Sequence, residues 1–535
     1  MKTKILLFLI VLTASLLRIY NLASTPPSLY WDEVSLGYNA YSILRTGRDE
    51  HGELYPLARF IAFGDFKPPF YIYATIPSLA LFGLNEFAVR FPSALAGIFL
   101  VIISYLLARE IFKSKKIALI SALMVSISIW SLQLSRGAFE ANLAASLNAA
   151  AVLFFIRFEK KKGWNLLISF ILFVLSFYTF NANRIIAPVL LLALSIGKIK
   201  IFIEEKKWLI ISLVVASLLI LPSVSYLKSR ESRIRFQEVS IFNNLEVLQK
   251  SNERIALHNN SLLGRFFHNR RFAYFRELLD HYTDHFRADF LFFTGDRNPR
   301  LSTQVVGELY LFCLPFLLIG IFYAIKNRSK NVWFLFLWLL ISIIPASVSK
   351  ETPHALRTAS IMPIYEILTA LGLCFVYGII DKKFSRKSFA LFASVFLTLN
   401  IYYYLHNYYI HYPLDWAGEW QYGYKQAIEK ISKLEHQFDF IAVSNTLGRP
   451  YIYFLFYNQV DPQYYWQTRL ANRDWFGFWT VSGFGKYRFN LDQLPNLKGK
   501  ILVIGNSSET KNFNILETIY SPKGEIVLRI GSTTQ

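Results

Sequence analysis

Cysteine is scarce in this 535-residue chain: Cys313 and Cys374 are the only two, and both lie inside apolar runs. Two such isolated thiols argue against a disulfide framework and against a thiolate metal site. The chain also lacks a CxxC pair, a P-loop and a GxGxxG turn. Soluble nucleotide chemistry therefore has no support in the sequence.

Acidic residues are also few, 36 against 57 lysines and arginines, which gives a net charge of +21. Such a balance can indicate nucleic-acid binding. Here the basic residues cluster in short loops between apolar runs, as topology signals do, so we expect no nucleic-acid partner. Because 54% of the residues are hydrophobic and 17% are aromatic, we predict a polytopic membrane protein.

Eleven apolar stretches are long enough to cross a membrane as helices, which takes about 20 residues each. A further stretch, 68–84, is short and carries Pro68, Pro69 and Pro77. Because proline removes a backbone donor and breaks helices, we predict a re-entrant or interfacial helix there. The predicted spans are 4–22, 88–109, 117–134, 141–158, 165–181, 184–199, 207–226, 303–325, 331–349, 358–379 and 387–405.

The charged loops predict how these spans are oriented. With a cytoplasmic N-terminus, every loop predicted inside is basic, for example at Lys160, Lys161 and Lys162. Counting 68–84 as a full crossing would put those loops outside and break this rule. The first helix is expected to remain uncleaved, because Arg18 interrupts any clear cleavage site. We therefore predict a multi-pass plasma-membrane protein whose loops 23–67 and 227–302 face outside.

Two domains are expected, a transmembrane domain over residues 1–405 and a small extracytoplasmic α/β domain over residues 406–535. The second contains strand-like runs at 438–443, 500–504 and 525–530, with helix-like stretches between them. It carries no catalytic motif. Acceptor binding and a stabilising cap both remain open as its role.

Polar residues predicted at the outer face include Trp31-Asp32-Glu33, directly after the first span, and Lys67, one loop later. Ionisable residues at that depth are costly unless they are functional. Asp32 can act as a general base toward an acceptor hydroxyl, or it can cap a short helix that starts near Glu33. Lys67 precedes two prolines that stiffen the backbone, and it suits either a phosphate or an interfacial anchor.

Further candidates on the same face follow later spans. Arg136 and Glu140 are four residues apart, so they would meet on one helix face if that stretch is helical. Arg184 stands at the mouth of the sixth span, as a phosphate ligand or as an anchor. His354 and Arg357 can bind an anionic group, or they can anchor a loop at the interface.

A divalent metal is the one cofactor that the sequence leaves open. His281, Asp284 and His285 form an H-x-x-D-H string, whose two histidines could hold a metal from one helix face. No third ligand is specified, and a solvated helix face explains the same pattern. We therefore assign no metal ligands.

The order of these motifs resembles that of the GT-C superfamily of glycosyltransferases. Tyr30-Trp31-Asp32-Glu33, followed by Gly37-Tyr38, looks like their first-loop motif, and Lys67-Pro68-Pro69-Phe70-Tyr71 looks like the next. The pattern is similar to the branch that holds the dolichyl-phosphate-mannose–protein mannosyltransferases and the bacterial lipid A aminoarabinose transferases. Segments 135–142 and 353–357 resemble later loop motifs, and the resemblance covers roughly residues 1–405.

The resemblance implies an inverting transfer of a sugar from a polyprenyl-phosphate-linked donor to an acceptor hydroxyl at the outer face. Asp32 would be the general base, and Glu140 would orient the acceptor or the base. Lys67, with Arg184 or Arg357, would hold the departing lipid phosphate and stabilise its growing charge. The remaining site candidates are Glu33, Arg136, His285 and His354.

Two positions depart from the pattern of that family. Phe66 stands before Lys67 where some relatives carry an acidic residue linked to metal binding, and Glu140 stands where aspartate is commoner. Both indicate a divergent bacterial-type member whose sugar, a hexose or a pentose, and whose lipid, protein or glycan acceptor stay open.

Two other classes of function remain as alternatives, a polytopic transporter or lipid flippase of envelope biosynthesis and a non-catalytic assembly factor. A transporter would favour ionisable residues at mid-membrane and internal repeats. The sequence has no clear repeat, and its charged residues gather at the outer face. This distribution favours the transferase.

Overall fold

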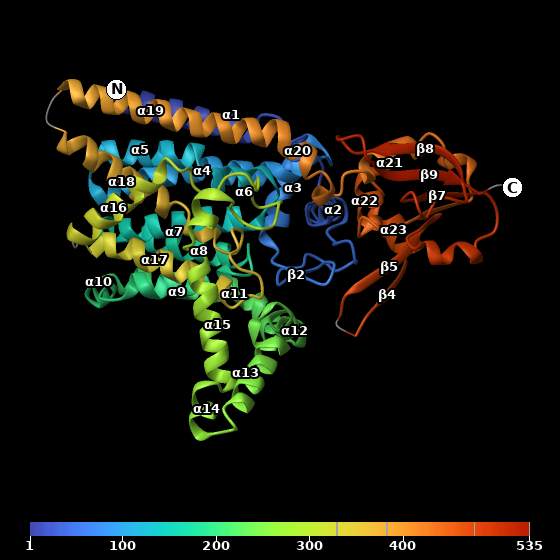
Figure 1. Cartoon of the computed structure of the whole chain (residues 1–535), viewed down its shortest axis with the longest axis horizontal. Helices are drawn as coiled ribbons and strands as arrows, with labels where there is room; N and C mark the ends of the chain where they lie inside the picture. The colour runs from blue at the N-terminus through green and yellow to red at the C-terminus, as the bar shows by residue number, and fades with distance from the viewer. Residues whose placement is uncertain (328–329, 381–382, 476, 534–535) are drawn as a thin grey trace. The chain divides into compact units, whose positions relative to one another are not determined.

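The computed structural model describes residues 1–327, 330–380, 383–475 and 477–533 (Figure 1). Within these ranges the chain is mostly α-helical, and a seven-stranded sheet lies near its C-terminus. The chain divides into two compact units. Unit 1 comprises Met1–Leu17, Ala96–Leu134 and Glu140–Tyr402, and unit 2 comprises Arg18–Leu95, Ser135–Phe139 and Tyr403–Gln535.

Apolar helices make up most of unit 1. By length and composition, 5 helices in the described ranges can cross a membrane, or up to 6 if the bent pair of α5 (Lys115–Ile127) and α6 (Ile129–Arg136) counts as one. Their spans are α4 (Glu86–Phe112), α7 (Glu140–Lys161), α11 (Lys206–Lys228), Ala359–Ile379 with α18 (Ile364–Ile379), and Phe384–Asp415 with α19 (Lys383–His406). Shorter apolar helices of unit 1 are α8 (Trp164–Phe177), α9 (Asn183–Ser195), α16 (Cys313–Asn327) and α17 (Lys330–Ser347), and unit 2 contains α3 (Phe70–Phe82).

Each of the predicted spans coincides with one of these helices, with the α5–α6 pair, or with α1 (Lys2–Ile19). How many of them cross the membrane stays a prediction. The proline-bearing stretch 68–84 forms α3, which has 13 residues with Pro77 inside. At about 1.5 Å per residue, α3 is shorter than a hydrocarbon core of about 30 Å.

Close helix packing in unit 1 depends on two glycines. A Cβ on Gly320 of α16 would lie 2.0 Å from the Leu368 carbonyl oxygen of α18. A Cβ on Gly372 of α18 would lie 1.9 Å from the Phe316 carbonyl oxygen. Only glycine lets the two backbones approach so closely, as small residues do in membrane helix pairs.

Most of the long predicted outer loop is helical. It contains α12 (Arg230–Val239), α13 (Leu245–Leu257), α14 (Leu262–Phe267) and α15 (Arg270–Asp284). Figure 1 shows α13 and α15 as a helical hairpin that projects from the helices of unit 1, with α14 at its tip.

Unit 2 combines the loop that follows α1 with the C-terminal sheet. The loop forms α2 (Trp31–Thr46) and a hairpin of β1 (Phe60–Ile61) and β2 (Phe66–Lys67). A Cβ on Gly37 of α2 would lie 2.7 Å from the Phe456 ring of α22 (Pro450–Tyr457), so glycine allows this contact. Helix α23 (Pro462–Thr468) also belongs to this unit.

The seven strands have the order β4-β5-β6-β3-β7-β9-β8. Strand β3 is parallel to β6 and β7, and the other pairs are antiparallel. The strand-like runs at 438–443, 500–504 and 525–530 correspond to β3, β7 and β9. The strands are β3 (Phe440–Val443), β4 (Leu470–Arg473), β5 (Trp479–Phe484), β6 (Tyr487–Arg488), β7 (Ile501–Gly505), β8 (Asn514–Tyr520) and β9 (Ile526–Ser532).

Candidate functional site

Asp32 and Lys67 form an ion pair in unit 2, with 3.2 Å between Asp32 Oδ1 and Lys67 Nζ. Asp32 lies in the first turn of α2, and Lys67 ends β2, where its backbone pairs with Phe60 of β1. The Lys67 side chain is 7% exposed and that of Asp32 is 28% exposed. The pair is therefore a partly open carboxylate beside a buried cation.

Tyr30, rather than Asp32, occupies the cap position of α2. The helix begins at Trp31, and the Glu33 carboxylate accepts a hydrogen bond from the Tyr30 backbone N–H at 3.2 Å. Asp32 lies one residue inside the helix, where the positive end of the helix dipole favours a carboxylate. The interpretation of Asp32 as a helix cap is wrong.

Glu33 is fully buried and is held on both carboxylate oxygens. Arg90 of α4 donates from Nε to Oε1 at 2.9 Å and from Nη2 to Oε2 at 3.1 Å, and the Ala138 N–H donates to Oε1 at 2.7 Å. Arg90 also donates to the backbone carbonyls of Leu22 and Pro26. These contacts make Glu33 the anchor that orients the first turn of α2, and with it Asp32.

Arg136 ends α6 and is buried. It donates to the Tyr408 hydroxyl at 3.2 Å and to the Thr25 carbonyl at 3.0 Å, and its guanidinium lies over the Tyr408 ring at 5.3 Å. Arg136 thus ties the segment before α2 to the C-terminal part of unit 2. Glu140 is the first residue of the next helix, α7, so the two residues do not share one continuous helix face.

A turn from the C-terminal sheet lies against the residue next to Asp32. A Cβ on Gly448 would lie 2.9 Å from Trp31 Cζ3, and the next residue, Arg449, stacks 5.4 Å over Phe63 in the β1–β2 hairpin. Gly448 follows the carboxyl end of β3, the edge of a parallel strand where α/β folds bind ligands. The sheet and the ion pair are therefore neighbours within unit 2.

Glu140 and Arg184 belong to unit 1, as do all the later candidates. Glu140 is buried in the first turn of α7. The Arg184 guanidinium lies over the rings of Phe177, at 5.9 Å, and Tyr226, at 4.9 Å. Its Nε and Nη2 are buried and have no hydrogen-bond acceptor among the described residues. Arg184 therefore has donor capacity that an anionic ligand could satisfy.

His285 and His354 lie together in unit 1, where the His354 N–H donates to His285 Nε2 at 3.2 Å. His354 Nδ1 is 3.6 Å from the Asp296 carboxylate, which also accepts from the Ala355 N–H at 2.6 Å. Burial raises the pKa of Asp296 to about 6, and the hydrogen bonds and Arg357 oppose this shift. Burial, and after it the charge of Arg357, also lowers the pKa of His354.

The proposed histidine pair is poorly arranged for a metal. His285 Nδ1 lies 2.9 Å from the His281 carbonyl, and its Nε2 accepts from His354, so both ring nitrogens are engaged. The His281 ring bonds the Ser349 carbonyl and lies 3.3 Å from Glu277. Among the residues that the structure describes, no group of three His, Cys, Asp or Glu side chains is placed to hold a metal.

Sequence reasoning missed the buried cluster Asp49-Glu50-His51 of the first loop. The Trp466 indole donates to the Glu50 carbonyl at 3.0 Å, and the His51 ring stacks on Trp479 at 5.4 Å. Burial, reinforced by the charge of Asp49, raises the pKa of Glu50 to about 8. Three consecutive ionisable residues in a loop predicted to face outside were the available signal. Their contacts fasten this loop to the C-terminal part of unit 2.

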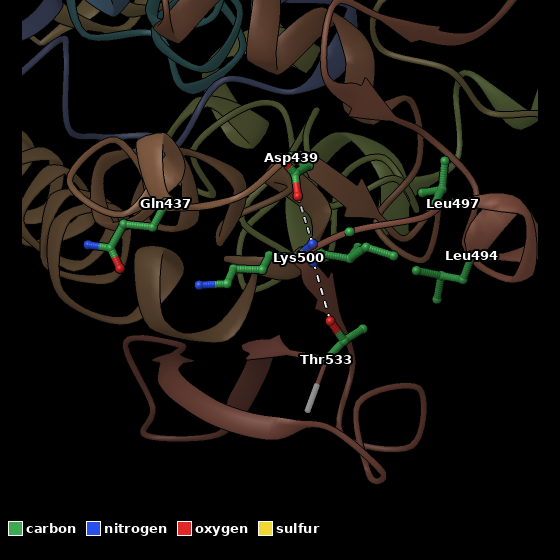
Figure 2. A pocket seen from close by; sticks show the side chains of 8 residues that line it. Gln437, Asp439, Leu494, Leu497, Lys500 and Thr533 are labelled. Atoms are coloured by element: carbon green, nitrogen blue, oxygen red, sulfur yellow. Dashed lines mark hydrogen bonds between the residues drawn. The ribbon is translucent and has the colours of Figure 1, made fainter. Parts of the chain in front are cut away.

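A hollow of about 710 Å³ lies at the end of the sheet opposite to Gly448 (Figure 2). It lies at the amino ends of β3 and β7, beside Asp439 and Lys500. The Lys500 N–H donates to Asp439 at 2.8 Å, and the Ile501 N–H donates to Thr533 at 3.3 Å. Because these polar groups already bond one another at the edge where α/β folds rarely bind ligands, we assign this hollow no chemistry.

Comparison with known proteins identifies the fold. Residues 66–226 match the family model described as dolichyl-phosphate-mannose-protein mannosyltransferase. An uncharacterized protein of Aquifex aeolicus (strain VF5) is 44% identical over 62 residues, which are 12% of this chain and only 12% of that relative's length.

Two crystal structures of ArnT from Cupriavidus metallidurans resemble the chain over almost its whole length. The apo structure gives a TM-score of 0.54 at 12% identity, and covers 98% of this chain and 97% of that chain. The structure bound to undecaprenyl phosphate gives a TM-score of 0.53 at the same identity and coverage. The predicted GT-C fold, a helical membrane domain with a C-terminal sheet region, is thereby confirmed.

Proposed function

We propose that this protein is an inverting glycosyltransferase that takes a sugar from a polyprenyl-phosphate donor at the outer face of the membrane. The observation that carries this proposal is the 3.2 Å pair of Asp32 and Lys67, with its partly exposed carboxylate and buried ammonium. The GT-C fold and the undecaprenyl phosphate bound by ArnT support the choice of donor.

In the proposed reaction the acceptor hydroxyl attacks the anomeric carbon of the donor while Asp32 removes the hydroxyl proton. The new glycosidic C–O bond forms as the bond to the phosphate oxygen breaks, which inverts the anomeric centre. The electron pair of the broken bond leaves with the polyprenyl monophosphate. Lys67 stabilises the charge that develops on that phosphate, and Asp32 shares the same cation before the donor arrives.

Arg184 is the proposed second ligand of the lipid phosphate. Its buried Nε and Nη2 have no acceptor within the described ranges, and a phosphate oxygen supplies one. Arg357 is a further phosphate candidate, and Glu140 is proposed to orient the acceptor. The sugar and the acceptor are left open, because the fold does not determine them.

The test is transfer by the purified full-length protein in detergent, offered polyprenyl-phosphate sugars and the matching nucleotide sugars in parallel. Simple alcohols and lipid extracts serve as acceptors, and released polyprenyl phosphate is measured beside the glycosylated product. We expect turnover of a lipid-phosphate sugar that falls by at least about 100-fold in Asp32→Asn.

Asp415→Asn is the matched control, because Asp415 forms a 2.8 Å pair with Lys523 elsewhere in unit 2. This variant should keep wild-type turnover and an unchanged melting temperature. Full turnover in Asp32→Asn would remove the proposed base. Turnover of nucleotide sugars alone would overturn the proposed donor.

A further inference from the structure

The distal half of the α13–α15 hairpin has an unusual charge distribution. Residues 254–276 contain five arginines and no aspartate or glutamate. Acidic side chains return only at Glu277, Asp280 and Asp284, in the half of α15 that leads back to the bundle. Positive charge is thus concentrated at the free end of the hairpin, in Arg254, Arg265, Arg270, Arg271 and Arg276.

Large apolar side chains are exposed in the same segment. Leu257 is 82% exposed, Leu262 is 86% exposed and Leu263 is 71% exposed. Four phenylalanines of the segment are exposed as well, although they are distributed over α14 and α15. They are Phe266, Phe267, Phe272 and Phe275. Exposed apolar side chains gathered in one segment indicate a site of contact with another molecule or with a membrane.

The base of the hairpin is fixed to the bundle, whereas its tip is free. The Tyr282 hydroxyl donates to the Leu340 carbonyl of α17 at 2.9 Å, and His281 lies 2.9 Å from the Ser349 carbonyl. From this base, Figure 1 shows the hairpin extending across the direction of α7 and α17. In a membrane crossed by those helices, the hairpin runs parallel to the membrane plane.

We propose that the tip of this hairpin, residues 254–276, lies in the outer membrane interface and binds anionic lipid headgroups. Leucines and phenylalanines enter the boundary between headgroups and acyl chains, as in interfacial amphipathic helices. The arginines bind the lipid phosphates, which attract basic side chains near the surface. Charge complementarity selects anionic lipids, because the segment holds five arginines and no carboxylate of its own, although Arg276 lies 3.9 Å from Asp280 just beyond it.

The hairpin's position is tested in the full-length protein reconstituted in lipid nanodiscs. A Leu262→Cys variant is labelled with an environment-sensitive fluorophore, and quenching by nitroxide-bearing lipids is measured in phosphatidylcholine discs with and without phosphatidylglycerol. Lys523→Cys, on an exposed turn of the C-terminal sheet, is the matched label expected to remain in water. The unsubstituted protein, carried through the same labelling, corrects for Cys313 and Cys374.

We expect quenching at position 262 to exceed that at position 523 severalfold, and to be strongest in the anionic discs. The triple variant Arg265→Gln/Arg270→Gln/Arg271→Gln should reduce it to the level of the neutral discs. Replacing the same three residues with lysine, which keeps the charge, should retain it.

Two outcomes would overturn the inference. Equal and weak quenching at both positions in both lipids would exclude membrane contact and leave a protein partner as the occupant of the tip. Strong quenching that ignores phosphatidylglycerol and the glutamine substitutions would exclude recognition of anionic lipid. Sugar transfer is not part of the readout, so the result is independent of the proposed activity.

Discussion

Lys67 Nζ lies 3.2 Å from Asp32 Oδ1, although the two residues come from different elements of the loop at residues 23–67. The first turn of α2 orients the carboxylate, and the β1–β2 hairpin, followed by Pro68 and Pro69, orients the ammonium. Asp32 is held by the helical backbone of α2, and Lys67 is held because the two prolines that follow it restrict the backbone. The pair is thus set before any substrate binds.

Replacing the cation of this pair tests its role in transfer. We expect Lys67→Gln to lower the rate of sugar transfer by roughly 100-fold, because the departing phosphate loses its charge partner. The double variant Asp32→Asn/Lys67→Gln should be scarcely slower than the slower single variant, since the two groups act on one step. Initial rates with saturating donor measure both effects. Lys523→Gln, the cation of an exposed pair, is the control, and a wild-type rate in Lys67→Gln would contradict the assignment.

The buried pair of Glu33 and Arg90 predicts a large loss of stability when its cation is removed. Arg90→Met leaves the Glu33 carboxylate buried without its partner, which costs about 3–5 kcal/mol. Thermal unfolding in detergent, monitored by size-exclusion chromatography, should show a much lower melting temperature for Arg90→Met than for the wild type. The double variant Glu33→Gln/Arg90→Met should recover part of the loss, because it removes the unpaired charge. Equal melting temperatures for the two variants would contradict this explanation.

The order of the motifs predicted the fold class. It did not predict which side chains contact each other, such as Asp32 with Lys67 or Glu33 with Arg90. Asp32 and Lys67 were placed on one face of the membrane by the charge pattern of the loops, while their contact required the turn of the β1–β2 hairpin. Arg90 lies in the mostly apolar helix α4, and the residues next to it in the sequence do not indicate that it pairs with Glu33. Such pairing depends on how α4 packs against α2, which a periodic pattern does not specify.

The candidate site residues are divided between the two units, so the sequence could not show whether they act together. Glu140, Arg184, His285, His354 and Arg357 fall in unit 1, whereas Asp32 and Lys67 fall in unit 2. Their common use in one reaction stays a proposal. The cluster at Glu50 escaped notice because its burial comes from a segment roughly 400 residues later in the chain.

Glu50 predicts how the stability of the protein depends on pH. Burial followed by the charge of Asp49 raises the Glu50 pKa from 4.5 to about 8, so the folded form keeps a proton that the unfolded form has lost. Stability therefore falls as pH rises from about 4.5 to about 8. Glu50→Gln should abolish this loss, and the difference in melting temperature between Glu50→Gln and the wild type should grow across that window.

His51 supplies a control of opposite sign for the same measurement. Burial, with Arg469 adding, lowers the His51 pKa from 6.5 to about 3, so the unfolded form binds a proton that the folded form refuses. Stability is therefore lost as pH falls from about 6.5 to about 3. His51→Gln should reduce the loss of stability below about pH 6.5 and leave the loss between about pH 4.5 and 8 that comes from Glu50 unchanged. A pH-independent difference between Glu50→Gln and the wild type would contradict the buried-carboxyl explanation.

Gly448 tests whether the C-terminal sheet positions the loop that carries the proposed base, Asp32. Its φ is +80°, and a Cβ there would lie 2.9 Å from Trp31 Cζ3, so Gly448→Ala must displace the residue before Asp32. Gly524 has a similar φ of +85° with no atom within 4 Å of an added Cβ, so Gly524→Ala shares the backbone strain without the clash.

Gly448→Ala should lose at least as much stability as Gly524→Ala, and only Gly448→Ala should slow sugar transfer, by roughly 10- to 100-fold. The rate constants and melting temperatures of the two purified variants separate strain from displacement. Trp31→Phe/Gly448→Ala should recover transfer, because the smaller ring removes the atom that clashes. If Gly448→Ala and Gly524→Ala transfer sugar equally well, the contact at Trp31 serves stability alone, and the C-terminal sheet acts as a cap.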